Sequence, residues 1–172
     1  MQIHSNHQQN IHSSVIASAY GLTKSFAGKK ALDNIDLEIK SGQVFAILGA
    51  NGAGKTTLLR CMMGHLTPRH GRIKWAENAN LGYCPQDTGA EFVNNTNLFD
   101  WMSLWRKPNH DDQIVRATLG RLLFSADEYK KKARVCSGGE KNRLLFGKLM
   151  MMDTNVLVMD EPTNHLDMES IE

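Results

Sequence analysis

The chain has 172 residues, of which 41% are hydrophobic, 22% charged and 7% aromatic, and this composition is typical of one globular domain. No apolar run approaches the roughly 18 to 20 residues that a membrane-spanning helix needs, so the sequence predicts no membrane segment of its own. The formal net charge of +2 is too small to indicate a nucleic acid or membrane partner, but the charges are unevenly spread. Residues 1–152 hold all 20 basic residues against 12 acidic ones, whereas residues 153–172 hold six acidic residues and no basic one.

The N-terminal segment, residues 1–14, is polar and is predicted to be disordered. Metal capture is the alternative for its three histidines, His4, His7 and His12. The segment carries no Lys or Arg and no apolar core of a signal peptide, so a secretory or mitochondrial address is not indicated. We expect the folded domain to cover residues 15–172.

The first half of the domain alternates strands with one helix. Apolar residues at a period of two, or in short continuous runs, predict the strands, and helical spacing of leucines and methionines predicts the helix. The run at 44–48 is typical of a strand buried on both faces. In chain order we expect strands at 15–22 and 35–39 with a turn at 28–30 between them, a strand at 44–48, a helix at 55–63, and strands at 72–75 and 81–84.

The stretch from about residue 88 to 134 changes character and predicts a small helical insert. Leu98, Trp101, Met102 and Trp105 fit one helical face, and a second apolar face follows near Leu119. These Trp and Met residues are expected to form core rather than a ligand site. After the insert, a helix is predicted to about Met151 and a strand at Val156–Met159, so that the whole pattern indicates an α/β fold with a parallel sheet.

The strongest motif lies between the strand at 44–48 and the helix that follows it. Residues 49–56 read Gly-Ala-Asn-Gly-Ala-Gly-Lys-Thr and match the P-loop pattern completely. Such a loop turns backbone N–H groups toward phosphates, and the helix adds its positive end. Lys55 is expected to neutralise the β and γ phosphates of a nucleotide, and the Thr56 hydroxyl to ligate Mg²⁺. The predicted ATP-binding residues of the loop are Gly49, Asn51, Gly52, Ala53, Gly54, Lys55, Thr56 and Thr57.

A second motif closes the strand Val156–Met159 with two carboxylates. Asp160 at the strand end is expected to hold Mg²⁺ opposite Thr56, and Glu161 to orient and deprotonate the attacking water as the catalytic base. A solvated acidic strand end is the alternative if the motif is taken alone.

A third motif, Cys136-Ser137-Gly138-Gly139-Glu140, resembles the signature of ABC ATPases, which usually reads Leu-Ser-Gly-Gly-Gln or Glu. The resemblance implies a P-loop NTPase fold of ABC ATPase type with a small antiparallel β subdomain and a helical insert. It also implies that Ser137, Gly138, Gly139 and Glu140 act on ATP bound to an opposite ABC ATPase domain. Cys136 departs from the pattern, and its small side chain is expected to weaken local packing. An ordinary helix cap is the alternative for Ser137 and Glu140.

Other positions follow from the same resemblance. Phe26 looks like the aromatic residue that stacks on adenine, and Gln86 resembles the Q-loop glutamine that reaches Mg²⁺ and the water. Core packing and a solvated loop are their respective alternatives. Asp167 resembles the D-loop aspartate that crosses to the partner domain. His165 does not match the switch histidine, which in this family follows a further strand, so the isolated chain is expected to bind ATP with little or no turnover.

The run Glu161-Pro162-Thr163-Asn164-His165-Leu166-Asp167 resembles the ABC-F branch, and residues 71–172 look like the second ATPase domain of its YbiT-like members. The resemblance implies ATP hydrolysis with Mg²⁺, a second ATPase domain in the same protein, and action on ribosomes in the cytoplasm. Two alternatives stay open: the ATPase subunit of an ABC membrane transporter, and a nucleotide- or rRNA-binding module without turnover. The three cysteines lie far apart without a CxxC pair, which favours a reducing cytoplasm over a disulfide or zinc framework. They are Cys61, Cys84 and Cys136.

Overall fold

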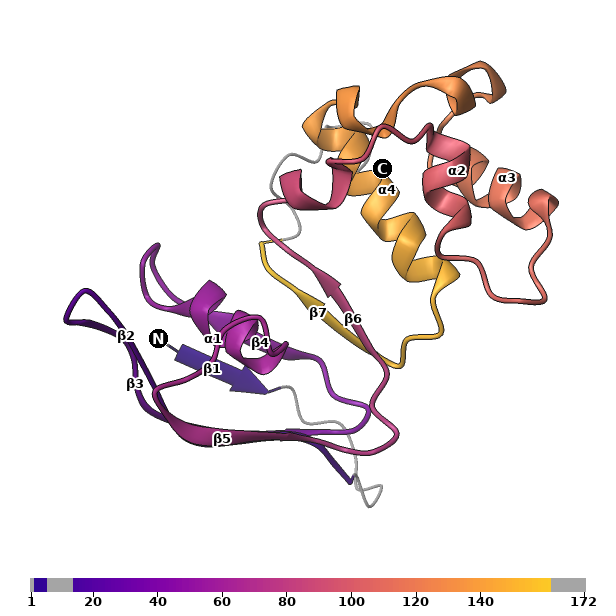
Figure 1. The fold of residues 1–172 in the computed structure, drawn as a ribbon. Coiled ribbons are helices and arrows are strands. Elements are labelled where there is room, and N and C mark those ends of the chain that lie inside the picture. The colour runs from indigo at the N-terminus through magenta and orange to yellow at the C-terminus, as the bar shows by residue number, and fades with distance from the viewer. Residues whose placement is uncertain (1, 6–13, 162–172) are drawn as a thin grey trace. The chain divides into compact units, whose positions relative to one another are not determined.

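The computed structural model describes residues 2–5 and 14–161, and the chain forms two compact units, residues 1–79 and 80–172. Unit 1 is built around antiparallel strands (Figure 1). Its main sheet has the order β3-β2-β5, and a second pair of strands has the order β1-β4. The elements are β1 (Gln2–Ser5), β2 (Val15–Phe26), β3 (Lys29–Lys40), β4 (Phe45–Leu48), α1 (Lys55–Met62) and β5 (His70–Trp75).

The strands β2 and β3 are longer than the apolar pattern predicts. They meet in a two-residue turn, Ala27-Gly28, in which both residues have positive φ, the geometry that suits the twist of a hairpin. Because ladder hydrogen bonds need only backbone, the pairing continues through polar residues up to Phe26 opposite Lys29. The predicted turn therefore lies at the right place, and the strand ends lie closer to it than expected.

The expectation about β4 is wrong, and four residues near the start of the chain form a strand that the sequence did not predict. Residues 1–14, predicted to be disordered, include the strand Gln2–Ser5, which pairs antiparallel with β4. Backbone pairing along a strand edge offsets the polar composition of this segment. β4, predicted to be buried on both faces, leaves Leu48 52% exposed, and Val44 lies outside the strand at 81% exposure. β4 belongs to a two-stranded sheet, which covers it less than a central strand position would.

The core of unit 1 fixes α1 against the main sheet. Leu58, Cys61 and Met62 on the buried face of α1 join buried residues of β2 and β3 in one cluster. The indole N–H of Trp75 in β5 donates to the backbone oxygen of Met62 at 2.8 Å and so ties the end of α1 to the sheet. Packing thus holds α1 on the sheet, and the loop that precedes α1 is joined to this fixed helix.

Unit 2 combines a parallel strand pair with helices (Figure 1). β6 pairs with β7 in parallel, as the alternation of strands and helices predicts, and both strands have the predicted bounds. The elements are β6 (Leu81–Cys84), the 3₁₀ turn η1 (Gly89–Phe92), α2 (Leu98–Ser103), α3 (Asp112–Arg121), the 3₁₀ turns η2 (Ala126–Lys130) and η3 (Ala133–Val135), α4 (Gly138–Met151) and β7 (Val156–Met159).

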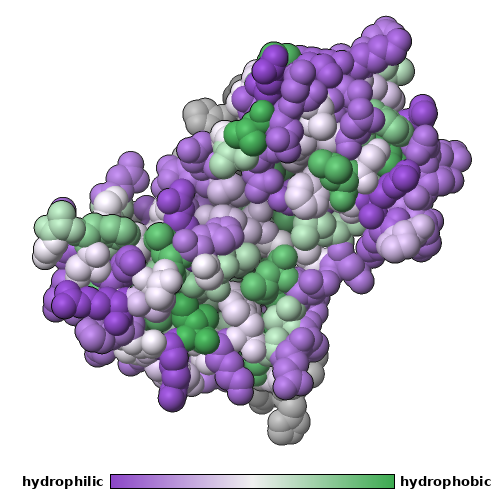
Figure 2. All heavy atoms as spheres, viewed as in Figure 1, coloured by the Kyte–Doolittle hydropathy of each residue, from purple (hydrophilic) through white to green (hydrophobic). Residues whose placement is uncertain are grey.

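The core of unit 2 joins α2 and α3 to α4. Trp101 and Met102 are 2% and 0% exposed, as expected for core residues, and they cluster with Leu119 of α3 and Leu144 of α4. α4 approaches α2 closely at Gly147, where an added Cβ would lie 2.5 Å from the terminal methyl of Met102. On the face drawn in Figure 2, apolar residues reach the surface in small groups among hydrophilic ones, which is ordinary for a folded surface.

Candidate functional site

The loop at residues 49–54 connects β4 to α1 in unit 1. Gly54 caps α1 with φ +90°, a left-handed conformation, and a Cβ at this position would clash with the carbonyl oxygen of Ala31. Only glycine fits there without a shift of β3. The Ala53 N–H donates to the Ala50 carbonyl at 3.0 Å and tightens the loop. The strand, loop and helix predicted from the P-loop pattern are therefore present in that order.

Lys55 begins α1, and its ammonium group folds back over the loop. It donates to the carbonyl oxygens of Gly49 at 2.6 Å and Ala50 at 3.3 Å. Thr56 and Thr57 follow on the first helical turn, both half-buried, and α1 has no acidic residue in that turn. This end of α1 thus offers a cation, hydroxyl groups and the positive pole of a helix, and such groups together bind anions.

The two carboxylates after β7 occupy different environments in unit 2. Asp160 is 2% exposed, its backbone N–H donates to the Cys84 carbonyl at 2.9 Å, and its Oδ2 atom is buried without a hydrogen-bond partner. Glu161 is half-buried and has φ +52°, a strained conformation for a residue with a side chain. A buried carboxylate oxygen without a partner is costly unless a cation compensates it, so Asp160 fits the predicted metal ligand.

Gln86 and Glu161 meet although 75 residues separate them. The Gln86 side-chain N–H donates to Oε2 of Glu161 at 2.8 Å, because β6 and β7 are neighbouring parallel strands and both residues follow their carboxyl ends. The sequence assigned both residues to the attacking water through separate motifs. The structure brings these two side chains together.

The predicted signature forms the start of α4. Ser137 caps the helix: its Oγ accepts from the Glu140 N–H at 3.2 Å, while Glu140 Oε2 accepts from the Ser137 N–H at 2.7 Å. This is a capping box, the alternative that the sequence offered for these residues. Cys136, expected to weaken packing, is 5% exposed within the core cluster of unit 2, and burial raises the pKa of its thiol.

Lys131, at the end of η2, pairs with Glu140 at 2.6 Å. Burial works to raise the pKa of Glu140, but the hydrogen bonds from Lys131 and Ser137 outweigh it and hold that pKa below its ordinary value. The hydrogen bond to Glu140 in turn raises the pKa of Lys131. Sequence reasoning missed Lys131, because it is one of three adjacent lysines and no spacing rule distinguishes them.

Of the remaining residues named from the sequence, the structure describes Phe26 but not Asp167 or His165. Phe26 ends β2 and is 48% exposed, with the Lys24 ammonium 5.5 Å from its ring centre. Asp167 and His165 lie outside the described residues. Unit 1 holds the loop and Phe26, and unit 2 holds the carboxylates, Gln86 and the signature.

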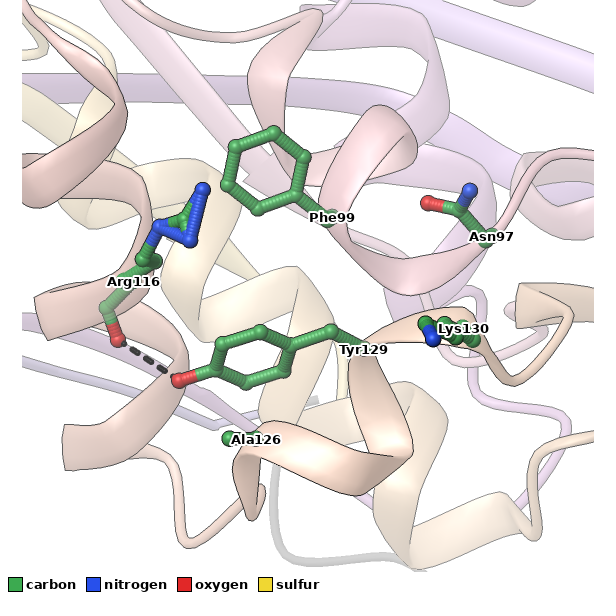
Figure 3. A pocket seen from close by; sticks show the side chains of 6 residues that line it. All are labelled: Asn97, Phe99, Arg116, Ala126, Tyr129 and Lys130. Carbon is green, nitrogen blue, oxygen red and sulfur yellow. Dashed lines mark hydrogen bonds between the residues drawn. The ribbon is translucent and has the colours of Figure 1, made fainter.

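A separate pocket of about 460 Å³ lies in the helical segment of unit 2 (Figure 3). Phe99 and Tyr129 present aromatic rings to it, and the guanidinium of Arg116 lies 4.9 Å from the Phe99 ring centre. The Tyr129 hydroxyl donates to the backbone oxygen of Arg116 at 3.2 Å. The lining residues are Asn97, Phe99, Arg116, Ala126, Tyr129 and Lys130, and none of them is acidic.

No group of three or more His, Cys, Asp or Glu side chains in residues 2–5 and 14–161 is arranged to hold a metal ion. Across the same residues, no helix has the length and apolarity that crossing a membrane requires.

Taken together, a glycine-rich loop before a helix, an apolar strand that ends in carboxylates and a capped Ser-Gly-Gly helix define an ABC-type P-loop ATPase domain. The chain matches the ABC transporter family over residues 32–164 and belongs to that family. It is 55% identical over 152 residues to "Probable ATP-binding protein YbiT" of Escherichia coli O157:H7, and this match covers 88% of the chain and 29% of YbiT. The similarity to YbiT agrees with the ABC-F branch predicted from residues 161–167.

Two further comparisons bear on function and fold. The chain is 32% identical to the energy-dependent translational throttle protein EttA of Haemophilus influenzae, with 91% of the chain and 28% of EttA covered. Its fold is similar to cbiO1 from Clostridium perfringens, part of the ABC transporter complex cbiONQ, with a TM-score of 0.64, 26% identity, and 91% of this chain and 69% of that chain covered. The chain thus spans less than a third of the length of the two curated relatives.

Proposed function

We propose that the chain binds ATP and takes part in its hydrolysis as an ABC-F type ATPase domain. The observation that carries this proposal is the loop at residues 49–54, fixed by the left-handed Gly54 and closed by the Lys55 ammonium. Its N–H groups and Lys55 would hold the phosphates, and the exposed ring of Phe26 would stack on adenine.

The ligands that we propose for Mg²⁺ are oxygens, as this ion prefers. In unit 2, Gln86 carries an amide oxygen and Asp160 a buried carboxylate oxygen without a described partner, and Thr56 of unit 1 carries a hydroxyl. When bound, Mg²⁺ neutralises charge on the phosphate oxygens. Asp160 lies between the ends of β6 and β7, and its burial there fixes the position of its carboxylate.

Glu161 is proposed as the general base. Its carboxylate accepts a hydrogen bond from Gln86 at 2.8 Å, and this contact orients Oε2. Its φ of +52° is a strained conformation of the kind that clusters at functional sites. Ser137, Gly138 and Gly139, with Asp167 of the D-loop, are proposed to act on ATP held by a second ABC ATPase domain, in the same protein or in a dimer.

The test of hydrolysis is phosphate release from ATP by the full-length protein and by its Glu161→Gln variant. The variant is expected to lose turnover and to keep nucleotide binding. Asp153→Asn is the matched control, because Asp153 is an exposed acid of the same acidic region and pairs only with Lys107 among the contacts described. Equal and substantial rates for the wild type and Glu161→Gln would refute the assignment of Glu161. Nucleotide binding without turnover in the wild type would favour the binding-module alternative.

For the physiological role, we propose action on ribosomes in the cytoplasm. The likeness to EttA, whose name denotes a translational throttle, supports this role. The pocket of Figure 3 supports contact with RNA, since aromatic rings and two cations line it, of which Arg116 also pairs with Asp112 at 3.8 Å. Ribosome co-sedimentation is expected to weaken with rising salt, and to weaken further with Arg116→Gln and Lys130→Gln but not with Lys74→Gln in β5.

The second candidate is the ATPase subunit of an ABC membrane transporter. The similarity to cbiO1 favours it, because that protein is part of a transporter complex. A stable complex with a membrane protein encoded beside the gene, together with no ribosome binding, would select this candidate. A second P-loop in the same reading frame would favour the ABC-F proposal.

A further inference from the structure

The carboxylate of Glu140 is shared between two elements of unit 2. Its Oε2 accepts from the Ser137 N–H at 2.7 Å and completes the cap of α4, while its Oε1 accepts from the Lys131 ammonium at 2.6 Å. The Glu140 side chain is 16% exposed and that of Lys131 32% exposed, so water screens this pair less than a surface pair. One carboxylate therefore links the signature serine to the helical segment before it.

The position of Lys131 is set by the helical segment and not by α4. Its backbone oxygen accepts from the Leu98 N–H at the start of α2 at 3.0 Å, and its backbone N–H donates to the Glu128 oxygen at 2.8 Å. The next residue, Lys132, forms an antiparallel bridge with Asn97. With the backbone of Lys131 held on both sides, its ammonium reaches Glu140 from a fixed base.

The charge of Glu140 presents a problem for a helix end that meets a phosphate. The helix dipole and the Ser137 hydroxyl, whose oxygen accepts from the Glu140 N–H, favour an anion there. An uncompensated carboxylate at the third helical position would repel the same anion. Lys131 compensates that charge, and the pair Lys131–Glu140 leaves the end of α4 close to neutral. A glutamine at the position of Glu140 would need no such partner.

We propose that Lys131 is a positioning residue for ATP hydrolysis, which holds and neutralises Glu140 so that Ser137 can act on the γ-phosphate of ATP bound to the opposite domain. The proposal rests on the function proposed above for Ser137. It assigns Lys131 no contact with ATP, because its described partner is Glu140.

The geometric part of the proposal is tested without nucleotide. Amide hydrogen exchange at Ser137 reports whether Glu140 still accepts that N–H. Lys131→Met is expected to speed exchange at Ser137, whereas Lys131→Arg and the control Lys132→Met leave it unchanged. Lys132 suits as the control because it is adjacent and exposed, and its ammonium donates to the Asn95 backbone oxygen at 3.0 Å. Unchanged exchange in Lys131→Met would overturn the positioning role.

The electrostatic part is tested by phosphate release from ATP in the full-length protein. Lys131→Met is expected to lower kcat by roughly three- to tenfold, the range for loss of one typical hydrogen bond, with binding of a fluorescent ATP analogue unchanged. Glu140→Gln alone keeps a capping side chain without the charge, and its rate is the reference for the double variant. The double variant Lys131→Met with Glu140→Gln is expected to recover most of the lost rate.

The outcomes separate this proposal from the proposed function. A wild type that releases no phosphate above background refutes hydrolysis itself, and exchange at Ser137 still decides the geometry. A hydrolysing wild type with an unaffected Lys131→Met, or a double variant no faster than Lys131→Met, overturns the role of Lys131. Loss of rate together with loss of nucleotide binding would indicate misfolding, and Lys131→Arg, which keeps the charge, must then restore both for the proposal to stand.

Discussion

The close approach of α4 to α2 leads to a sharp prediction about two helical glycines. Gly147 lies in the middle of α4, where a Cβ would lie 2.5 Å from the Met102 terminal methyl and would also clash with a methyl of Leu122. Gly120 lies near the end of α3, and a Cβ there would meet no atom within 4 Å. The same substitution, glycine to alanine, therefore tests helix propensity at one position and propensity plus packing at the other.

The expected free energies of unfolding differ in sign. Gly120→Ala gains up to about 1 kcal/mol, because alanine loses less backbone freedom on folding than glycine. Gly147→Ala gains the same term but overfills a packed core, which costs about 1 to 3 kcal/mol. Met102 is 0% exposed and has no solvent-facing space to move into, so we expect a net loss of roughly 1 to 2 kcal/mol at Gly147.

Equilibrium unfolding in urea, followed by tryptophan fluorescence, measures both variants. Trp101 and Trp105 lie in or against the core cluster of unit 2 and report on the region that Gly147 occupies. The dependence of the unfolding free energy on urea should stay constant, so that the midpoint alone moves. If Gly147→Ala were as stable as Gly120→Ala, the packing of α4 against α2 described here would be refuted.

Three further predictions concern two carboxylates and one partly buried ion pair. Glu161→Gly is expected to be about 1 kcal/mol more stable to urea unfolding than Glu161→Ala, because φ +52° strains any residue with a Cβ. Equal stability of the two variants would contradict the strain. The pKa of Glu140 is lowered, so its contribution to stability is complete above the ordinary glutamate pKa and is lost as the pH falls through the lowered pKa. Urea unfolding at a series of pH values should therefore show the stability difference between wild type and Glu140→Gln shrinking on acidification. A difference that does not depend on pH would contradict this role of the Glu140 carboxylate. Lys148→Met is expected to lower the free energy of unfolding by about 1 to 3 kcal/mol. Lys148 lies 2.8 Å from Glu91 and 4.0 Å from the Trp105 ring centre, and 12% of its side chain is exposed. A thermal melt identical to that of the wild type would exclude a stabilising role.

Much of the candidate site can be predicted from the local sequence. The loop before Lys55 is predicted because glycines, a lysine and a threonine at fixed spacing sit between a strand and a helix, and each of these signals is local. The strands Leu81–Cys84 and Val156–Met159 have the predicted bounds, and the start of α4 follows from Ser137 and its glycines. Such features depend on neighbours within a few residues, which a single sequence contains.

Tertiary structure alone decided which side chains meet. Nothing local indicates that Gln86 donates to Glu161, or that Lys131 and not Lys132 reaches Glu140, since these contacts depend on strand pairing and on the turn that ends η2. The same holds for β1, whose polar residues are ordered by pairing with β4. The sequence by itself therefore determined the class of chemistry and the elements that carry it, whereas partners and charge compensation were decided by packing, because burial and long-range hydrogen bonds join residues that no local pattern relates.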